Sequence, residues 1–182
     1  MDKFASKSSG RVFLAVIPDP DTAERIHRLA RALKRAHHFE GKLIARERLH
    51  ISLFSLIGAP EHHVRAACAA ARDMRTEPFE VSFDRTASFR GRSGNRPFVL
   101  VGEKGLRQLR SFRRMLGAAM ARGGLRRVTK TSFEPHVTLL YDARGVDEYP
   151  IEPIHWTVKD FVLVRSMKGH EYLERWSLQT SG

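Results

Sequence analysis

The chain has 182 residues, and its 32 Lys and Arg side chains outnumber its 20 Asp and Glu side chains, which gives a formal net charge of +12. This length predicts one domain or one unit of two lobes. The 42% hydrophobic share is enough for a packed core, which argues against a disordered basic chain. Because Cys68 is the only cysteine, a disulfide framework and a metal site built from several cysteines are excluded. The surplus of positive charge favours an anionic partner, most simply nucleic acid.

The beginning of the chain carries no sign of a targeting or membrane segment. Residues 1–10 are polar and lack the apolar centre of a signal peptide. The apolar run over residues 12–17 is much shorter than the ~20 residues that a membrane helix needs. We therefore expect a flexible tail over residues 1–10, a single two-lobed domain over residues 11–182, and a cytoplasmic location.

The first third of the chain predicts a strand, a helix and a second strand. Residues 12–17 are typical of a buried strand, and the Pro and Asp residues that follow provide helix N-cap candidates. An amphipathic helix is expected over residues 22–37, because apolar side chains recur there at helical spacing. These apolar positions are Ile26, Leu29, Ala30 and Leu33. A strand is expected over residues 49–56, ended by a Gly and a Pro.

The middle of the chain continues with a second amphipathic helix over residues 64–74 and an alternating strand over residues 79–83. Residues 91–97 are expected to form a polar loop, since they match neither the dinucleotide-binding nor the Walker spacing of glycines. A buried strand is expected over residues 97–101. A helical stripe of apolar residues then runs from Leu106 to Met120 and stops at two glycines.

The last third predicts only strands, over residues 136–141, 156–165 and 172–179. The order strand, helix, strand therefore occurs twice, and an equal spacing separates Leu14 from His50 and Leu100 from His136. We interpret this as an internal duplication, in which residues 13–15 align with residues 99–101. Strands interleaved with few helices favour an α+β fold.

Two short motifs carry the chemistry: His50-x-Ser52 and His136-x-Thr138. Side chains two apart in a strand point to the same face, about 6.6 Å apart. Each motif therefore places an imidazole and a hydroxyl on one face, while the apolar neighbours belong to the core. Since the motifs hold matched positions in the two halves, we expect two imidazoles and two hydroxyls to converge on a groove.

This set suits the cleavage of a phosphodiester. An imidazole titrates near neutral pH, so one can act as general base and the other as general acid. Hydroxyls can donate hydrogen bonds to phosphate oxygens. A metal site is disfavoured, because no carboxylate completes a ligand set and hydroxyls are weak zinc ligands. A serine nucleophile activated within the first motif is also disfavoured, because side chains about 6.6 Å apart do not hydrogen-bond directly.

At these residues the sequence resembles the two-histidine phosphoesterases, in particular the branch named for 2′-5′ RNA ligase, whose members are RNA 2′,3′-cyclic phosphodiesterases. Leu49–Leu53 is similar to the first motif of the family, and Phe133–Leu139 to the second. The segments over residues 11–18, 161–166 and 172–178 are similar to its first and closing strands. The similarity extends over nearly the whole chain.

The resemblance implies a bilobal α+β fold, with two antiparallel sheets facing a central cleft and helices packed outside. It implies hydrolysis of an RNA or nucleoside 2′,3′-cyclic phosphate to the 2′-phosphate without metal or other cofactor. Carried over by position, His136 activates water, His50 protonates the leaving 3′ oxygen, and Ser52 and Thr138 hold the phosphate.

Two positions depart from the family pattern. Ser52 stands where the first motif usually has Thr, which keeps the hydroxyl. Tyr141 stands where close relatives often carry an Arg that contacts phosphate, and a phenol brings no positive charge. The missing charge can come from other basic residues of the chain. Candidates are Arg46, Arg48, Arg144, Arg165 and Lys168. Phe54 is predicted to share the face of His50 and Ser52, either stacking on a base or packing at the cleft edge.

Three functions remain open at this point. The first is a monomeric cyclic phosphodiesterase acting on RNA ends or nucleotides. The second is a related enzyme for 2′-5′ linked oligonucleotides or for a cyclic phosphate of ADP-ribose. The third is a protein that binds RNA ends or nucleotides in the same cleft without turnover. No membrane partner is expected.

Overall fold

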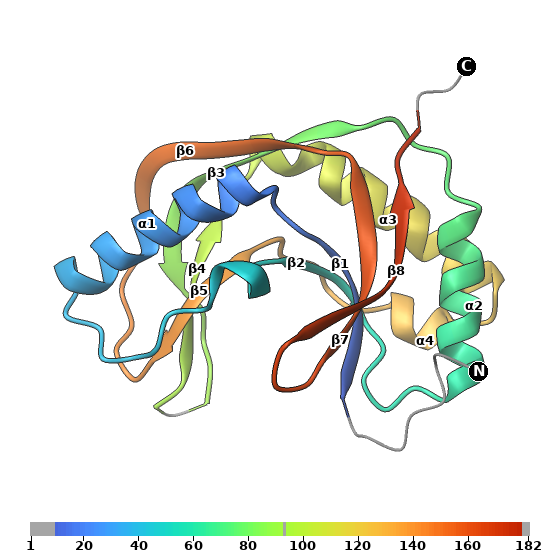
Figure 1. The fold of residues 1–182 in the computed structure, drawn as a ribbon, viewed down its shortest axis with the longest axis horizontal. Coiled ribbons are helices and arrows are strands. Elements are labelled where there is room, and N and C mark those ends of the chain that lie inside the picture. Colours follow the sequence, from blue (N-terminus) through green and yellow to red (C-terminus); the bar gives the residue numbers. More distant parts are fainter. Residues whose placement is uncertain (1–9, 93, 180–182) are drawn as a thin grey trace.

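The computed structural model describes residues 10–92 and 94–179, and it contains two four-stranded antiparallel sheets with helices packed around them. The expected tail over residues 1–10 lies outside the described residues, apart from Gly10. Figure 1 shows the two sheets beside each other, spanned by the long helices. The predicted α+β fold with two antiparallel sheets is confirmed.

The chain builds each sheet from a motif strand and three further strands. The first sheet has the order β2 (Ile51–Ser55), β1 (Arg11–Val16), β7 (Asp160–Ser166) and β8 (His170–Ser177). The second has the order β5 (Val137–Asp142), β4 (Arg96–Val101), β3 (Phe79–Ser88) and β6 (Tyr149–Val158). The strands that follow the two histidines, β2 and β5, are thus edge strands in equivalent places.

The helices are α1 (Pro20–Ala36), α2 (Glu61–Arg72), α3 (Arg107–Arg122) and the short α4 (Arg126–Thr129), with 3-10 turns at Arg46–Arg48 and Lys104–Leu106. Helix α1 begins where Asp19 accepts a hydrogen bond from the Thr22 amide at 2.9 Å. Although α1 connects two strands of the first sheet, it contacts β5 and β6 of the second. Helix α3, which connects β4 to β5, lies against Phe54 of β2 through Gly117. Each of these two helices therefore joins one sheet to the other.

One apolar core unites the molecule. Alternate residues of both sheets, such as Leu14 of β1 and Leu100 of β4, are fully buried in it with the apolar faces of the helices. The opposite faces carry smaller apolar clusters. On the first sheet this cluster is Phe13, Ala15, Val162 and Val164. On the second it is Ala87, Val99 and Val101. The core face fixes the orientation of each strand, and the opposite face is left for the cleft.

The strand expected over residues 156–165 is wrong, because two strands occupy this region. Strand β6 ends at Val158 in the second sheet, and β7 begins at Asp160 in the first. Alternating apolar residues at the end of β6 are followed by a continuous apolar run over Phe161–Val164 in β7, and the expected strand joined the two patterns across Lys159. Strand β3 extends to Ser88, beyond the expected end, and α4 was not expected.

The duplication is visible in the fold, but its alignment needs a correction. Ala15 pairs with Ser52 and Val99 pairs with Thr138. Ala15 therefore corresponds to Val99, not to Val101 as the equal spacing indicated. The paired residues are 52 − 15 = 37 positions apart in the first half and 138 − 99 = 39 in the second, so the equal spacing along the sequence does not reflect the strand register. Among the described residues, no helix is long and apolar enough to span a membrane.

Candidate active site

A cavity of about 520 Å³ lies between the two motif strands. His50 and Ser52 contribute to it from the first sheet, and His136 and Thr138 from the second. The structure thus brings together all four motif residues, as their matched positions predicted. The other lining residues are Arg11, Phe13, Ile44, Arg48, Ser55, Ile57, Asn95, Tyr141, Ser166 and His170. No carboxylate occurs among these described lining residues.

A bulge shapes each motif strand directly after its hydroxyl residue. In β2, Leu53 is the extra residue between Ser52, which pairs with Ala15, and Phe54, which pairs with Leu14. In β5, Leu139 is the extra residue between Thr138 and Leu140, which pair with Val99 and Phe98. A bulge shifts the later side chains to the opposite face. The residue three after each hydroxyl therefore faces the cleft: Ser55 in β2 and Tyr141 in β5.

This bulge overturns the predicted face of Phe54. Simple alternation placed its ring beside His50 and Ser52, but Phe54 is 2% exposed in the core beneath α3. Its ring lies 3.0 Å from the position of a Cβ on Gly117 and 4.2 Å from the guanidinium carbon of Arg113. The packing role, one of the two alternatives from the sequence, agrees with this position. Ser55 takes the place in the cleft, which strict alternation could not indicate.

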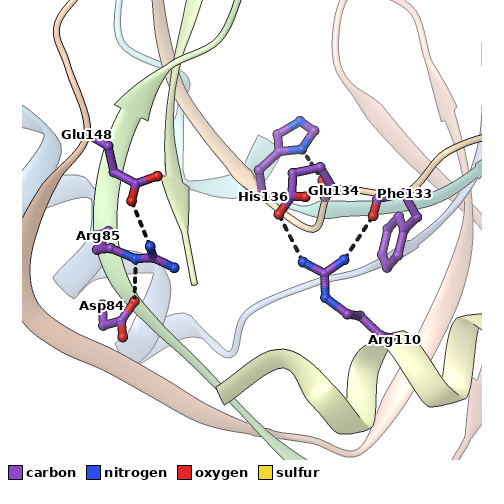
Figure 2. A network of polar contacts seen from close by, with 7 residues as sticks. All are labelled: Asp84, Arg85, Arg110, Phe133, Glu134, His136 and Glu148. Carbon is purple, nitrogen blue, oxygen red and sulfur yellow. Dashed lines mark hydrogen bonds and ion pairs between the residues drawn. The ribbon is translucent and has the colours of Figure 1, made fainter. Parts of the chain in front are cut away.

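Both catalytic candidates are oriented by the same local hydrogen bond. The Nδ1 of His50 lies 2.7 Å from the Arg48 carbonyl, and the Nδ1 of His136 lies 2.8 Å from the Glu134 carbonyl (the second is drawn in Figure 2). A carbonyl only accepts, so Nδ1 carries the proton in each ring. Nε2 is then the ring nitrogen that can accept or donate a proton in the cavity.

Aromatic contacts hold the two imidazoles from the side. The ring of Phe13 lies 4.9 Å from that of His50, and the ring of Phe89 lies 5.0 Å from that of His136, centroid to centroid. A third histidine, His170 at the start of β8, meets the His50 ring edge-on at 5.1 Å. His170 was not predicted, because it lies far along the sequence and in no motif. The β7–β8 hairpin brings it beside β1, where Arg11 pairs with Ser166.

The environment disfavours positive charge on the first-sheet histidines. Burial lowers the pKa of His50, and the charges of His136 and Arg48 act in the same direction, while the bond to the Arg48 carbonyl opposes them. Burial, with the charges of His50 and Arg48, lowers the pKa of His170 to about 4. His170 is therefore neutral at neutral pH, and its buried Nδ1 has no hydrogen-bond partner among the described residues.

Of the basic residues proposed to replace the family arginine, only Arg48 lines the cavity. Arg46 forms an exposed ion pair with Glu24 at 2.5 Å. Arg144 donates to the carbonyl of His38 at 3.1 Å, Arg165 pairs with Glu171 at 3.4 Å, and Lys168 lies in the exposed β7–β8 turn. Arg11, which was not among the candidates, also lines the cavity. Tyr141 lines it too and is 43% exposed.

Two further observations limit what the site contains and where it lies. Within the described residues, no group of three or more His, Cys, Asp or Glu side chains is arranged to hold a metal ion. A second cavity, of about 540 Å³, lies at the N-terminus of α1 and is lined by residues such as His155 and Lys159. It shares no lining residue with the two-histidine cavity, so the motif chemistry belongs to the latter.

Comparison with known proteins agrees with this architecture. The family model of the 2′-5′ RNA ligase superfamily matches residues 18–170, which include both motifs. The chain belongs to this superfamily. Membership makes it an enzyme of the phosphoesterase type, with the fold that the sequence resemblance implied. No curated protein sequence matches the chain.

Solved structures are similar over nearly their full length. A protein described as a phosphoesterase is 27% identical, with a TM-score of 0.69 over 94% of this chain and 99% of that one. E. coli LigT in complex with 3′-AMP is 25% identical, with a TM-score of 0.72 over 95% of this chain and 100% of that one. The protein TT0787 of Thermus thermophilus, at 22% identity and a TM-score of 0.72 over 92% and 97% of the two chains, shares the fold.

Proposed function

We propose that the protein hydrolyses the 2′,3′-cyclic phosphate of RNA ends or nucleosides and leaves a 2′-phosphomonoester. The observation that carries the proposal is the pair of imidazoles, His50 and His136, which line one cavity from equivalent strands with Nδ1 engaged by a carbonyl. A phosphodiester between two such rings meets a proton acceptor on one side and a proton donor on the other. Membership of the superfamily supports the same reaction class.

The reaction divides between the two rings as the family resemblance implies. Neutral His136 accepts a proton from water through Nε2 as the water oxygen attacks phosphorus. The bond from phosphorus to the 3′ oxygen breaks, and His50 in its protonated form gives its Nε2 proton to that oxygen. The product keeps phosphate on the 2′ oxygen, and the two histidines end with their protonation states exchanged. Solvent restores them.

Hydroxyls and one or two cations hold the phosphate. Ser52 and Thr138 follow the histidines at the cavity wall and can donate to the non-bridging oxygens. Arg48 and Arg11 supply positive charge in place of the arginine that Tyr141 replaces. E. coli LigT was crystallised with 3′-AMP, ATP and NADP+, which supports a nucleotide as the ligand of the equivalent cavity here.

The lowered pKa of His50 predicts the pH dependence of this reaction. The free enzyme must carry His50 as imidazolium to donate a proton, and this form is lost above its pKa. We therefore expect kcat/KM to fall as pH rises, and the fall should begin below the ordinary histidine pKa of about 6.5. A bound phosphate favours the imidazolium, so kcat should decline at higher pH than kcat/KM.

The test is an assay with nucleoside 2′,3′-cyclic phosphates in EDTA, with the product isomer identified by phosphorus NMR. We expect the 2′-phosphate only. His50→Ala and His136→Ala should each lower kcat/KM by roughly 10²-fold or more. His155→Ala, at an exposed histidine of β6 outside this cavity, is the matched control and should retain wild-type activity.

Four outcomes would overturn the proposed reaction or its substrate. Full activity in either motif variant would remove the assigned roles, and a requirement for added divalent metal would replace the mechanism. Nucleotide binding without turnover of any cyclic phosphate would favour the binding protein that the sequence left open. Turnover of 2′-5′ linked oligonucleotides alone would keep the two histidines and change the substrate.

A further inference from the structure

A smaller hollow, of about 310 Å³ and separate from the cavity at the N-terminus of α1, opens from the two-histidine cavity alongside β2. The two share Ser52, Ser55 and His136 as lining residues, so they are parts of one continuous surface. The hollow continues past Arg113 and the segment that leads into β5. We call it the β2 groove. Its remaining lining residues are Leu53, Phe54, Phe89, Thr131, Ser132, Phe133 and Glu134.

The groove exists because different groups cover the bulges of the two motif strands. Beside β5, the backbone of Ile44 donates to the carbonyl of the bulged Leu139 at 2.8 Å, and Leu43 bridges to Leu140, so a chain segment covers that edge. Beside β2, the carbonyl of the bulged Leu53 instead accepts from Nε of Arg113 at 3.0 Å. A side chain satisfies the bulge there, and the edge of β2 stays open to a ligand.

Arg113 gives the groove an unneutralised positive charge. Its guanidinium carbon lies 4.2 Å from the ring centre of Phe54 and 4.5 Å from that of Phe133. Its Nη2 reaches the carbonyl and hydroxyl of Thr131. Among the described residues, no carboxylate forms an ion pair with it. Burial lowers the pKa of Arg113, yet a guanidinium stays protonated at any physiological pH.

The only carboxylate among the described lining residues, Glu134, is already engaged. Its Oε1 lies 2.9 Å from Nη2 of Arg110, whose Nη1 also donates to the Phe133 carbonyl at 2.9 Å (Figure 2). The pair ties the Phe133–Glu134 segment to α3. With Glu134 neutralised by Arg110, the groove presents the aromatic rings of Phe89 and Phe133, several hydroxyls and the positive charge of Arg113. Aromatic faces beside cations are how proteins bind single-stranded nucleic acid.

The chemistry of the proposed substrate indicates which part of it occupies the β2 groove. A terminal ribose that carries a 2′,3′-cyclic phosphate has both of those hydroxyls esterified, so an RNA chain continues from it only through the 5′ oxygen. We propose that the β2 groove binds the nucleotide on the 5′ side of the reactive one, with its base on Phe133 and its phosphate near Arg113. This inference rests on the proposed function, and it makes the preferred substrate an RNA end and not a free mononucleotide.

The experiment compares two ligands that differ by that one nucleotide. For binding, adenosine 2′-phosphate is compared with the dinucleotide UpA carrying a 2′-phosphate, by calorimetry. For turnover, the corresponding 2′,3′-cyclic phosphates are compared by kcat/KM. We expect the dinucleotide to be favoured by roughly tenfold in both, the scale of one base stacked on an aromatic ring. Phe133→Ala should remove this preference.

Ser132→Asp tests the groove without truncating a packed ring. Ser132 is exposed at the groove wall, and an aspartate there repels the additional phosphate, so the dinucleotide preference should fall severalfold. The matched control is Ser177→Asp, at an exposed serine of β8 that lines neither hollow, which should retain the full preference.

The outcomes separate the groove from the reaction. Equal affinity and equal kcat/KM for the two ligand lengths in the wild type would overturn the groove proposal and leave the phosphodiesterase intact. A dinucleotide preference that survives both Phe133→Ala and Ser132→Asp would also overturn it. A binding preference that these variants abolish, in a protein that turns over neither cyclic phosphate, would support the groove and overturn the proposed reaction.

Discussion

Arg48 influences the cleft both through its backbone and through its charge. Its carbonyl accepts from Nδ1 of His50, and this orients the ring. Its guanidinium lines the cavity and lowers the pKa of His50 and of His170. Its Nε is buried, and no residue that the structure describes forms a hydrogen bond with it. One residue thus fixes the tautomer of the proposed acid and adds to the effect of burial in lowering its pKa.

Replacing Arg48 by Met should raise the pKa of both neighbouring histidines. The substitution keeps the carbonyl and removes the positive charge that disfavours imidazolium. Proton NMR titration of the imidazole resonances measures both values. Arg46→Met is the matched control, because that guanidinium pairs with Glu24 on the surface, and it should leave both titrations unchanged. An unaltered pKa of His50 in Arg48→Met would contradict this account.

Tyr141→Arg should restore a cation where this chain has a phenol. The bulge in β5 directs this position into the cavity, so a guanidinium there can reach a bound phosphate. A hydrogen bond to a charged group would lower KM for a nucleoside cyclic phosphate by roughly tenfold. Steady-state kinetics measure it, with Tyr141→Phe as the control that removes only the hydroxyl. An unchanged KM would indicate that Arg48 and Arg11 already neutralise the phosphate.

His170 should make the folded state sensitive to mild acid. Its pKa is about 4 in the fold and about 6.5 in an unfolded chain. Between these values the unfolded state binds more protons, so stability is lost as pH falls through this window. The groups that face His170 are His50, Phe13 and Arg48.

His170→Phe preserves the aromatic packing and removes the titration. The free energy of unfolding, measured in urea at about pH 7 and about pH 5, should therefore fall less in this variant than in the wild type. His155→Phe, at an exposed position, should show the wild-type difference between the two pH values. Equal losses in His170→Phe and the wild type would refute the role of this histidine.

At the scale of elements, strand alternation predicted the site correctly only as far as each bulge. His50, Ser52, His136 and Thr138 precede the extra residues, and all four line one cavity as expected. Phe54 follows a bulge and was assigned to the wrong face. A bulge depends on how two strands pair, which a single-strand pattern does not contain.

Contacts between segments far apart in the sequence could not be predicted either. His170 and Arg11 reach the cavity because β7 and β8 return beside β1. The break at Lys159 is not predicted from apolar content, because apolar residues lie on both sides of it, alternating in β6 and continuous in β7, although the two strands belong to different sheets. The long helices and most strands could be predicted from the periodicity of apolar residues, because each element buries one face and this sets the spacing locally.

One carboxylate of β5 binds the first part of the loop after α1. Asp142 is 6% exposed, and it accepts from the amides of Glu40 and Gly41 at 2.7 Å and of Arg144 at 2.9 Å. Gly41 is required there, because a Cβ would lie 1.8 Å from the Tyr141 carbonyl oxygen. The loop continues through Ile44 to the 3-10 turn that precedes β2, which places Ile44 in the cavity wall.

Asp142→Ala should therefore destabilise the fold, by roughly 2 kcal/mol or more, since three amides lose their acceptor. Urea unfolding measures the change. Asp147→Ala, at an exposed aspartate between β5 and β6, is the control and should be near neutral. Burial raises the pKa of Asp142, but the three amides outweigh it and hold the pKa below its usual value. Its contribution is thus present above about pH 4 and lost in stronger acid.

At the scale of the whole molecule, the net charge of +12 does not come from the two sheets, whose strands carry no surplus of basic residues, whereas basic residues outnumber acidic ones in α1, α2 and α3. The proposed chemistry uses nearly neutral side chains, and the cavity itself holds only Arg11 and Arg48 as permanent cations among its described lining residues. The other basic residues include the exposed ones of α3 and α4, beyond the β2 groove. We expect these residues to contribute only to the binding of ligands longer than a nucleotide.

The salt dependence of binding should distinguish the contribution of these outer basic residues from that of the cavity. Each phosphate neutralised on a single strand contributes a slope of about −0.7 to the dependence of log K on log salt concentration. A mononucleotide that fills only the cavity should show a shallow slope, and an RNA of roughly ten nucleotides with the same 2′-phosphate end a slope steeper by several phosphates. Fluorescence anisotropy over a salt series measures both. If the two slopes are equal, the basic surface outside the cavity makes no contact with RNA, and its charge serves solubility alone.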